Sequence, residues 1–191
     1  MAARSKRAEP KRRIRERLER LINDEDLDGA KELAEDLAQR HPQSINVAHA
    51  LGAIAEKRGQ FSEAAENFQA AIHRGGASPG IYTNLANMQL KLEDRAAAEH
   101  YLDKALGMRE DHAPALVLKA RMRRDAGRVD EAIALLDRVL GQDPQDVIAL
   151  YQRASLKSLD LPHSWLEYLE RVMGDEQRKI ERRTIAGFAL G

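Results

Sequence analysis

The chain has 191 residues, with six His and no Cys. Any metal ligands or acid–base groups would therefore have to be histidine and carboxylate side chains. The six His, at positions 41, 49, 73, 100, 112 and 163, show neither HxxH nor HxxxH spacing. No paired carboxylate completes a metal set beside them. No Ser–His–Asp arrangement can be read in the sequence, and the lack of Cys excludes disulfides, zinc–thiolate sites and thiol catalysis. We therefore expect no metal, no cofactor and no catalytic residue in this chain.

A glycine-containing stretch, GGASPG at residues 75–80, could suggest a phosphate-binding loop. Such a loop follows a strand and ends in Lys followed by Ser or Thr, whose groups reach the phosphates and the magnesium ion. Neither feature is present here. Between two helical patterns, Gly and Pro in close succession indicate a turn.

The charge is balanced over the chain but not along it. Lys and Arg total 31, and Asp and Glu also total 31. Residues 1–20 hold nine basic residues and three Glu, a balance of +6, whereas residues 24–36 hold seven acids and one Lys, a balance of −6. No apolar run approaches the roughly 18 residues of a membrane span, and no apolar core follows the basic start as in a signal peptide. We expect a cytoplasmic protein with no membrane contact.

The elements that must position any site are helices in a repeat of 34 residues. Ala and Leu dominate the apolar residues, aromatics make up only 4%, and apolar positions keep helical spacing. Frames that begin at residues 11, 45, 79, 113 and 147 align without an insertion. Their eighth position reads Leu18, Gly52, Ala86, Ala120 and Ala154, and their twentieth reads Ala30, Ala64, Ala98 and Ala132 before Leu166 breaks the pattern.

Small side chains at these two positions allow two antiparallel helices to approach closely, and the twenty-fourth position fills the gap with a larger residue such as Phe68. Gly59 and Gly127 fall where a helix C-terminus favours glycine. This frame resembles the tetratricopeptide repeat (TPR) over residues 11–160. The resemblance implies an all-α TPR-type α-solenoid of antiparallel helix pairs in a right-handed superhelix. Residues 1–10 would precede it as a basic tail.

The resemblance also implies which residues face a concave groove, namely positions 2, 5, 9 and 12 of each frame. Asn can pair with both groups of an extended peptide backbone, and Arg offers a fork for a carboxylate. Alternatively, each of these side chains is simply a solvated surface residue. The candidates for peptide binding are Asn46, His49, Thr83, Asn84, Asn87, Arg121, Arg124, Tyr151 and Ser155.

A known specialisation of such arrays is a clamp for a C-terminal carboxylate, built from Lys and Asn in one repeat, Asn in the next, and Lys and Arg in a third. Asn84 matches the middle requirement, and for this reason it joins the candidates. The flanking positions read His49 and Ala53 before it, and Pro114 and Leu118 after it. The clamp is therefore absent from the sequence.

The basic N-terminal residues allow three interpretations. They could be the solvated face of a first helix whose apolar stripe includes Leu18 and Leu21, a nucleic-acid patch, or a contact for an acidic partner. Glu16 and Glu19 interrupt the basic cluster and offer ion pairs along the helix, and no aromatic stacking platform accompanies it. We favour the first interpretation and expect no nucleic-acid partner.

The repeat departs from its pattern after residue 160. Leu161 and Pro162 break the fifth frame, and Trp165, Leu169, Val172 and Met173 form an apolar stripe that could cap the stack. Residues 161–191 are thus non-standard helices, either a cap or the start of a further repeat. The charged segment and its FALG ending resemble the junction in bacterial TPR-containing sulfotransferases, which implies a catalytic domain beyond this chain.

Together these patterns predict a non-enzymatic protein-interaction scaffold that binds a peptide or partner segment in the TPR groove. Two alternatives stay open: a substrate-recognition segment of a sulfotransferase whose catalytic domain lies outside this chain, and nucleic-acid binding through the basic arm. The sequence predicts a protein or peptide partner but names neither that partner nor an oligomeric state.

Overall fold

The computed structural model describes residues 11–156 and 163–174. The basic tail 1–10, the Leu161–Pro162 break and the residues 175–191 that carry the sulfotransferase resemblance lie outside this range. All regular structure in the described ranges is helical, which confirms the all-α prediction. The chain divides into two compact units, residues 1–98 and 99–191, and each is described by itself.

Ten α-helices and one short π-helix make up the described residues. In chain order they are α1 (Lys11–Asn23), α2 (Leu27–Arg40), α3 (Ile45–Lys57), α4 (Phe61–Ala71), the π-helix η1 (Ile72–Gly76), α5 (Pro79–Lys91), α6 (Arg95–Met108), α7 (Ala113–Asp125), α8 (Val129–Gln142), α9 (Val147–Leu156) and α10 (His163–Gly174).

The first helix of each pair begins 34 residues after the previous one. Helices α1, α3, α5, α7 and α9 start at residues 11, 45, 79, 113 and 147. Two of these starts have serine caps, because Ser44 Oγ accepts from Val47 N and Ser78 Oγ accepts from Ile81 N. Pro79 occupies the first turn of α5, where its missing N–H costs nothing. The GGASPG stretch is therefore the end of η1 and the capped start of α5, with no strand before it.

The turn inside each of the first four pairs has one residue in the left-handed region, always at the fifteenth position of the frame. These residues are Glu25 (φ 60°), Gly59 (72°), Glu93 (64°) and Gly127 (73°). Glycine adopts this backbone without strain, whereas glutamate does not. In the two glutamate turns the next residue, Asp26 or Asp94, caps the following helix with its carboxylate. Gln60 and Arg128, which follow the glycines, make no such side-chain bond.

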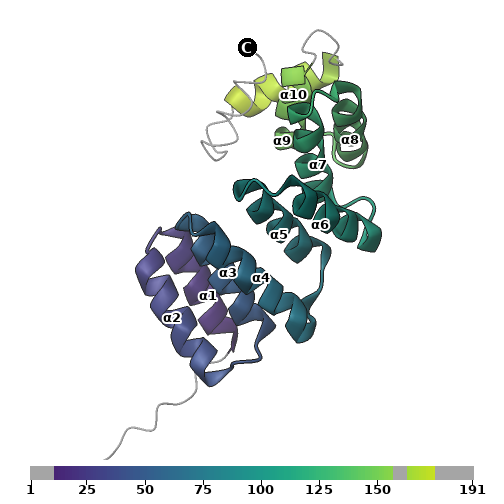
Figure 1. The fold of residues 1–191 in the computed structure, drawn as a ribbon. Coiled ribbons are helices and arrows are strands. Elements are labelled where there is room, and N and C mark those ends of the chain that lie inside the picture. Colours follow the sequence, from purple (N-terminus) through teal and green to yellow (C-terminus); the bar gives the residue numbers. More distant parts are fainter. Residues whose placement is uncertain (1–10, 157–162, 175–191) are drawn as a thin grey trace, which may run out of the picture. The chain divides into compact units, whose positions relative to one another are not determined.

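In the first unit, α1 to α4 lie side by side (Figure 1), and the core between them consists mainly of alanine and a few large residues. Phe68 on α4 is fully buried and faces Gly52 on α3. A Cβ at Gly52 would lie 2.7 Å from Phe68 Cε1, so the large ring requires the missing side chain. This is the small-against-large packing that the eighth and twenty-fourth positions predict.

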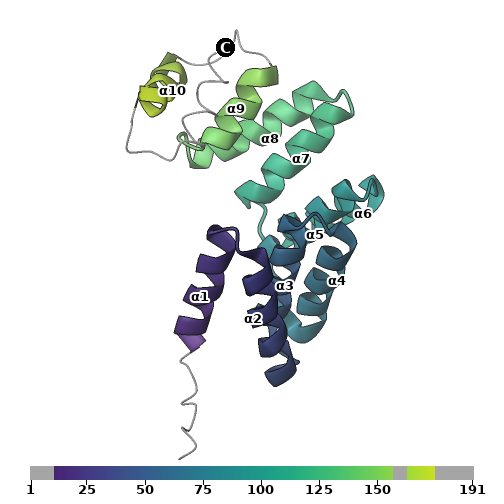
Figure 2. The same cartoon turned by 90° about the vertical axis from the view of Figure 1, so that its left-hand side faces the viewer.

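In the second unit, helices α7, α8 and α9 pack around one core (Figure 2). Ala120 and Leu136 take the places that Gly52 and Phe68 hold in the first unit, and both are buried. Helix α10 contributes Tyr168 and Val172 to the same cluster, and the Tyr168 hydroxyl donates to the Gln145 carbonyl at 3.1 Å. Val172 thus lies inward as the apolar stripe predicts. Within the ranges described, no helix is long and apolar enough to cross a membrane.

Candidate functional site

In the first unit, neighbouring first helices bring together two of the predicted residues, His49 on α3 and Asn84 on α5. Asn84 Nδ2 lies 3.3 Å from His49 Nε2, and the His49 ring tilts against Phe68 with centroids 5.6 Å apart. Burial lowers the pKa of His49, because the charged imidazolium loses hydration there. At neutral pH the ring is therefore uncharged, and its Nε2 can accept the amide hydrogen.

A second pair lies on the same two helices. Asn87, another predicted residue, donates from Nδ2 to Glu56 Oε1 at 3.1 Å. Burial raises the pKa of Glu56, although the Asn87 hydrogen bond and two nearby lysines oppose the shift. The two pairs give α3 and α5 a shared surface of half-buried polar side chains. We call His49, Glu56, Asn84 and Asn87 the α3–α5 face.

Two other predicted residues of the first unit lie apart from these pairs. Thr83 is only 7% exposed, and its hydroxyl donates to the Pro79 carbonyl one turn earlier at 2.7 Å. Its side chain therefore belongs to the packing of α5 rather than to an exposed surface. Asn46 is exposed at the first turn of α3.

In the second unit, the predicted residues lie on α7 and α9. Arg121 and Tyr151 are half-buried, and Tyr151 packs against the core of α7 to α9. Arg124 binds the carboxylate of its neighbour Asp125 through Nε and Nη2 at 3.1 and 3.0 Å. Ser155 is exposed, and its hydroxyl donates to the Gln152 carbonyl at 2.8 Å.

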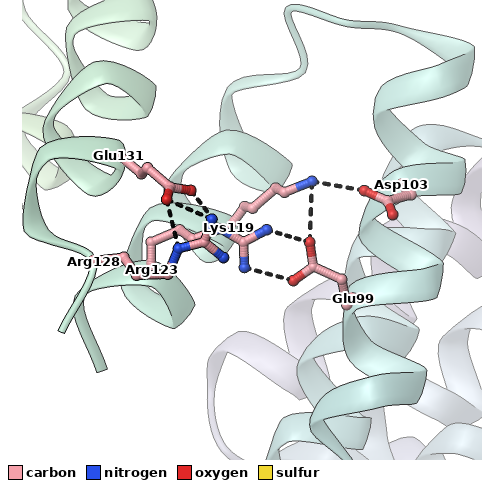
Figure 3. A network of polar contacts seen from close by, with 6 residues as sticks. All are labelled: Glu99, Asp103, Lys119, Arg123, Arg128 and Glu131. Carbon is pink, nitrogen blue, oxygen red and sulfur yellow. Dashed lines mark hydrogen bonds and ion pairs between the residues drawn. The ribbon is translucent and has the colours of Figure 1, made fainter. Parts of the chain in front are cut away.

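A larger polar cluster, which the sequence analysis did not single out, joins α6, α7 and α8 (Figure 3). Arg123 Nη1 donates to Glu99 Oε2 at 2.8 Å, and Lys119 Nζ lies 3.2 Å from Glu99 and 2.6 Å from Asp103. Arg123 also reaches Glu131 at 3.2 Å, which in turn binds Arg128. Acids and bases alternate through the cluster, so it stabilises the packing of the helices.

The charges in this cluster shift one another's titration. The hydrogen bond from Arg123, more than any other contact, lowers the pKa of Glu99, and Lys119 adds to the effect. The same bond raises the pKa of Arg123. Both shifts favour the charged forms that make the pair.

The repeat register contained a signal for these ion pairs. Asp103 and Asp137 both occupy the twenty-fifth position of their frames, and Lys119 and Arg153 both occupy the seventh position of the next frame. The structure pairs them in the same way, since Arg153 Nε donates to Asp137 Oδ1 at 3.0 Å. Both pairs could have been found in the sequence by a simple search. The search would look for an acid in the second helix of one frame and a base 16 residues later, in the first helix of the next frame.

Metal binding has no support among the described side chains, where no group of three His, Asp or Glu could hold an ion. The chemistry that the faces offer is hydrogen bonding, ion pairing and apolar contact. Such interactions can hold a polypeptide ligand.

Comparison with known proteins agrees with the helical repeat. Residues 83–147 match the family model of the tetratricopeptide repeat. No curated protein sequence matches the chain significantly.

Solved structures extend the likeness to most of the chain. A thermophilic TPR protein of Thermus thermophilus is 20% identical, with a TM-score of 0.72 over 95% of this chain and 99% of the other. YrrB, described as a TPR protein with an unusual peptide-binding site, is 20% identical with a TM-score of 0.58 over 89% and 88%. MamA of Desulfovibrio magneticus is 13% identical with a TM-score of 0.64 over 85% and 92%.

At these identities the neighbours show the fold, and the chain is an all-α array of TPR-type helix pairs. Arrays of this kind present extended surfaces and are typical of proteins that bind other proteins or peptides. The matches give no support to the sulfotransferase resemblance, which depends on residues beyond the described part of the chain.

Proposed function

We propose that the chain is a protein-interaction scaffold that binds a polypeptide segment on the first helices of its repeats. The observation that carries the proposal is the α3–α5 face. Its half-buried Asn84 and Asn87 are held in place by His49 and Glu56 before any ligand arrives. Side chains whose orientation is already fixed lose less entropy on binding, which favours affinity.

The described helices offer an interaction surface but no reactive constellation. Asn side chains can donate to and accept from an extended peptide backbone, a mode of binding that tolerates many sequences. The TPR fold supports this proposal, and the peptide-binding site in the description of YrrB supports it by analogy.

A displayed library of random peptides, selected on the whole chain, tests the proposal. Selected peptides should bind the variant with both Asn84→Ala and Asn87→Ala at least about tenfold more weakly, a loss of about 1.4 kcal/mol. The matched control is Asn67→Ala, because Asn67 is also a half-buried Asn but lies on the second helix α4, where it bonds to the Glu63 carbonyl. Peptides that bind the double variant and the parent chain equally well would contradict the proposal.

The two alternatives have no supporting observation in the described residues. The sulfotransferase relation can be tested by reading the genomic frame beyond Gly191 for a catalytic domain. Nucleic-acid binding can be tested by a salt titration with generic DNA, before and after removal of residues 1–13, because phosphate contacts weaken steeply with salt.

A further inference from the structure

Glu56, on the α3–α5 face, is a half-buried carboxylate with an incomplete set of partners. It is the only acidic residue on helices α3 and α5. Its Oε1 accepts from Asn87 Nδ2, and no hydrogen bond or ion pair reaches its Oε2 from the described residues. A carboxylate can accept about four hydrogen bonds. Glu56 therefore keeps capacity for a ligand on the surface where the proposed function places the peptide.

The nearby lysines do not complete this set of partners. Lys57 and Lys91 lower the pKa of Glu56, but burial raises it by more. Neither lysine forms an ion pair with Glu56 in the described part of the chain. The Lys91 ammonium lies instead over the ring of Phe61 on α4, 5.8 Å from its centroid. The carboxylate of Glu56 has therefore lost hydration without gaining a paired charge.

Two acids on the neighbouring second helix α4 show how Glu56 differs. Glu63 is also half-buried, but Lys31 Nζ lies 3.2 Å from its Oε1. Glu66 is exposed, so water hydrates its charge without a protein partner. Glu56 has neither a paired base nor full hydration. By charge complementarity, such a carboxylate favours a ligand that brings a positive charge to it.

From these contacts we infer that the α3–α5 face binds a polypeptide segment that carries a basic side chain, Arg or Lys, and that this side chain pairs with Glu56. The inference rests on the proposed function and specifies its ligand. Forming an ion pair normally costs the hydration of both charges. Folding has already removed part of the hydration of Glu56, and Asn87 holds one of its oxygens in place, so the cost on binding is smaller. Arginine fits best, because its planar fork can donate two hydrogen bonds to one carboxylate.

Selection from a displayed library of random peptides, on the whole chain and in parallel on its Glu56→Gln variant, tests the inference. Glutamine keeps the length of the side chain and an oxygen that can accept from Asn87, so the substitution removes the charge alone. Peptides selected on the parent chain should be enriched severalfold in Arg and Lys over the unselected library. The enrichment should be lost on Glu56→Gln. Equal contents of basic residues in the two selections would overturn the inference.

Fluorescence anisotropy with single selected peptides locates the contact. A peptide selected on the parent chain should bind Glu56→Gln at least about tenfold more weakly, and so should the same peptide with its arginine replaced by neutral citrulline bind the parent. The two losses should not add, because both changes remove one ion pair. Glu66→Gln is the matched control, since Glu66 is an exposed carboxylate on the second helix α4, and this variant should keep the parent affinity. An equal loss in the control, or additive losses, would overturn the assignment to Glu56.

Charge reversal guards against a misfolded variant. Glu56→Lys should lose the basic peptides and select peptides enriched in Asp and Glu, which an unfolded chain would not do. Spermidine that competes as well as the peptide would overturn the inference in favour of general cation binding. Selected peptides that depend on Asn84 and Asn87 but bind Glu56→Gln as tightly as the parent would refute this inference and leave the proposed function standing. A selection that yields no binding peptide would contradict both.

Discussion

Within each unit, successive helix pairs contact each other at the same position of the 34-residue frame. The kind of contact at that position differs between the two units. In the first unit the seventh residue is Leu51 in the frame at 45 and Leu85 in the frame at 79, and Leu85 is completely buried, whereas the frame at 11 has the exposed Arg17 there. In the second unit the same position is Lys119 or Arg153, and each binds an aspartate on the preceding second helix. One fold therefore accommodates both apolar and ionic contacts between repeats.

The difference has physical consequences for how each junction can respond. Apolar burial is not directional and does not depend on pH, whereas an ion pair needs fixed geometry and two charged partners. The packing between the two helices of one pair differs too. Gly52 lies against Phe68 in the first unit, and Ala120 and Leu136 hold the equivalent positions in the second. The units should thus differ in their response to substitution, salt and acid.

The largest expected effect on stability comes from giving the first unit the alanine of the second unit at position 8 of the frame, without changing the phenylalanine that packs against it. Gly52→Ala should destabilise the protein by about 3 kcal/mol, because the new methyl group would lie against the fully buried ring of Phe68. Adding Phe68→Leu should recover part of this loss, since alanine and leucine are compatible at the equivalent positions Ala120 and Leu136. Chemical denaturation of both single variants and the double variant measures the coupling, and additive losses would contradict it.

The next effect separates two arginines of the second unit. Arg123→Leu should cost about 2 kcal/mol, because it leaves the partly buried Glu99 with Lys119 alone. Arg153→Leu should cost much less or stabilise, because the Arg153 side chain is 10% exposed and its Nη1 has no hydrogen-bond partner among the described residues. Chemical denaturation measures both variants. Equal losses of unfolding free energy would contradict this difference between the Arg123 and Arg153 ion pairs.

A smaller effect is expected at the turns. Glu93→Gly should raise the free energy of unfolding by about 1 kcal/mol, because glycine adopts the left-handed backbone without strain. Gly127→Ala at the equivalent turn should lower it by a similar amount. Thermal unfolding of the two variants gives the signs, and a shift in the same direction for both would refute the argument from backbone strain.

The smallest expected effect concerns the pH dependence of stability, to which Glu99 and Glu56 should contribute with opposite signs. The pKa of Glu99 is lowered from its usual value of about 4.5, so its contribution to stability is present above that value and is lost as the pH falls through the lower folded pKa. The pKa of Glu56 is raised, so its contribution is present below about 4.5 and is lost as the pH rises through the higher folded pKa.

Two neutral variants test this pair of signs. Glu99→Gln should be less stable than the parent chain at pH 7, by less than about 1 kcal/mol, and the difference should shrink below pH 4.5. Glu56→Gln should be more stable than the parent at pH 7, and that difference should also shrink in acid. Urea titrations at pH 7 and pH 4 provide the comparison, and losses of the same sign at pH 7 would contradict it.

Much of the fold could be predicted because it depends on periodic features. The spacing of small residues such as Gly52 and Ala120 predicted the paired helices, and Gly59 and Gly127 predicted two turns. The glutamates at the other two turns escaped notice, because a left-handed glutamate is held there by its surroundings rather than by its own preference. The division into two compact units has no signature in a repeat that runs through it.

The predicted site residues were placed by analogy with the repeat, and the structure shows what analogy cannot supply. The contact of His49 with Asn84 depends on how two helices pack, and neither residue has a sequence signal for the other. Thr83 shares the repeat position of His49 but turns its hydroxyl back to its own helix. Position in a frame gives the side of a helix, whereas the partners of a side chain depend on its length and neighbours.

The turns inside the first four pairs alternate in kind along the chain. Along the chain they alternate between glutamate followed by a capping aspartate, at residues 25–26 and 93–94, and glycine followed by an uncapped helix start, at 59–60 and 127–128. Similar turns are therefore 68 residues apart rather than 34. Tandem duplication of a gene segment that encodes two repeats would leave this alternation.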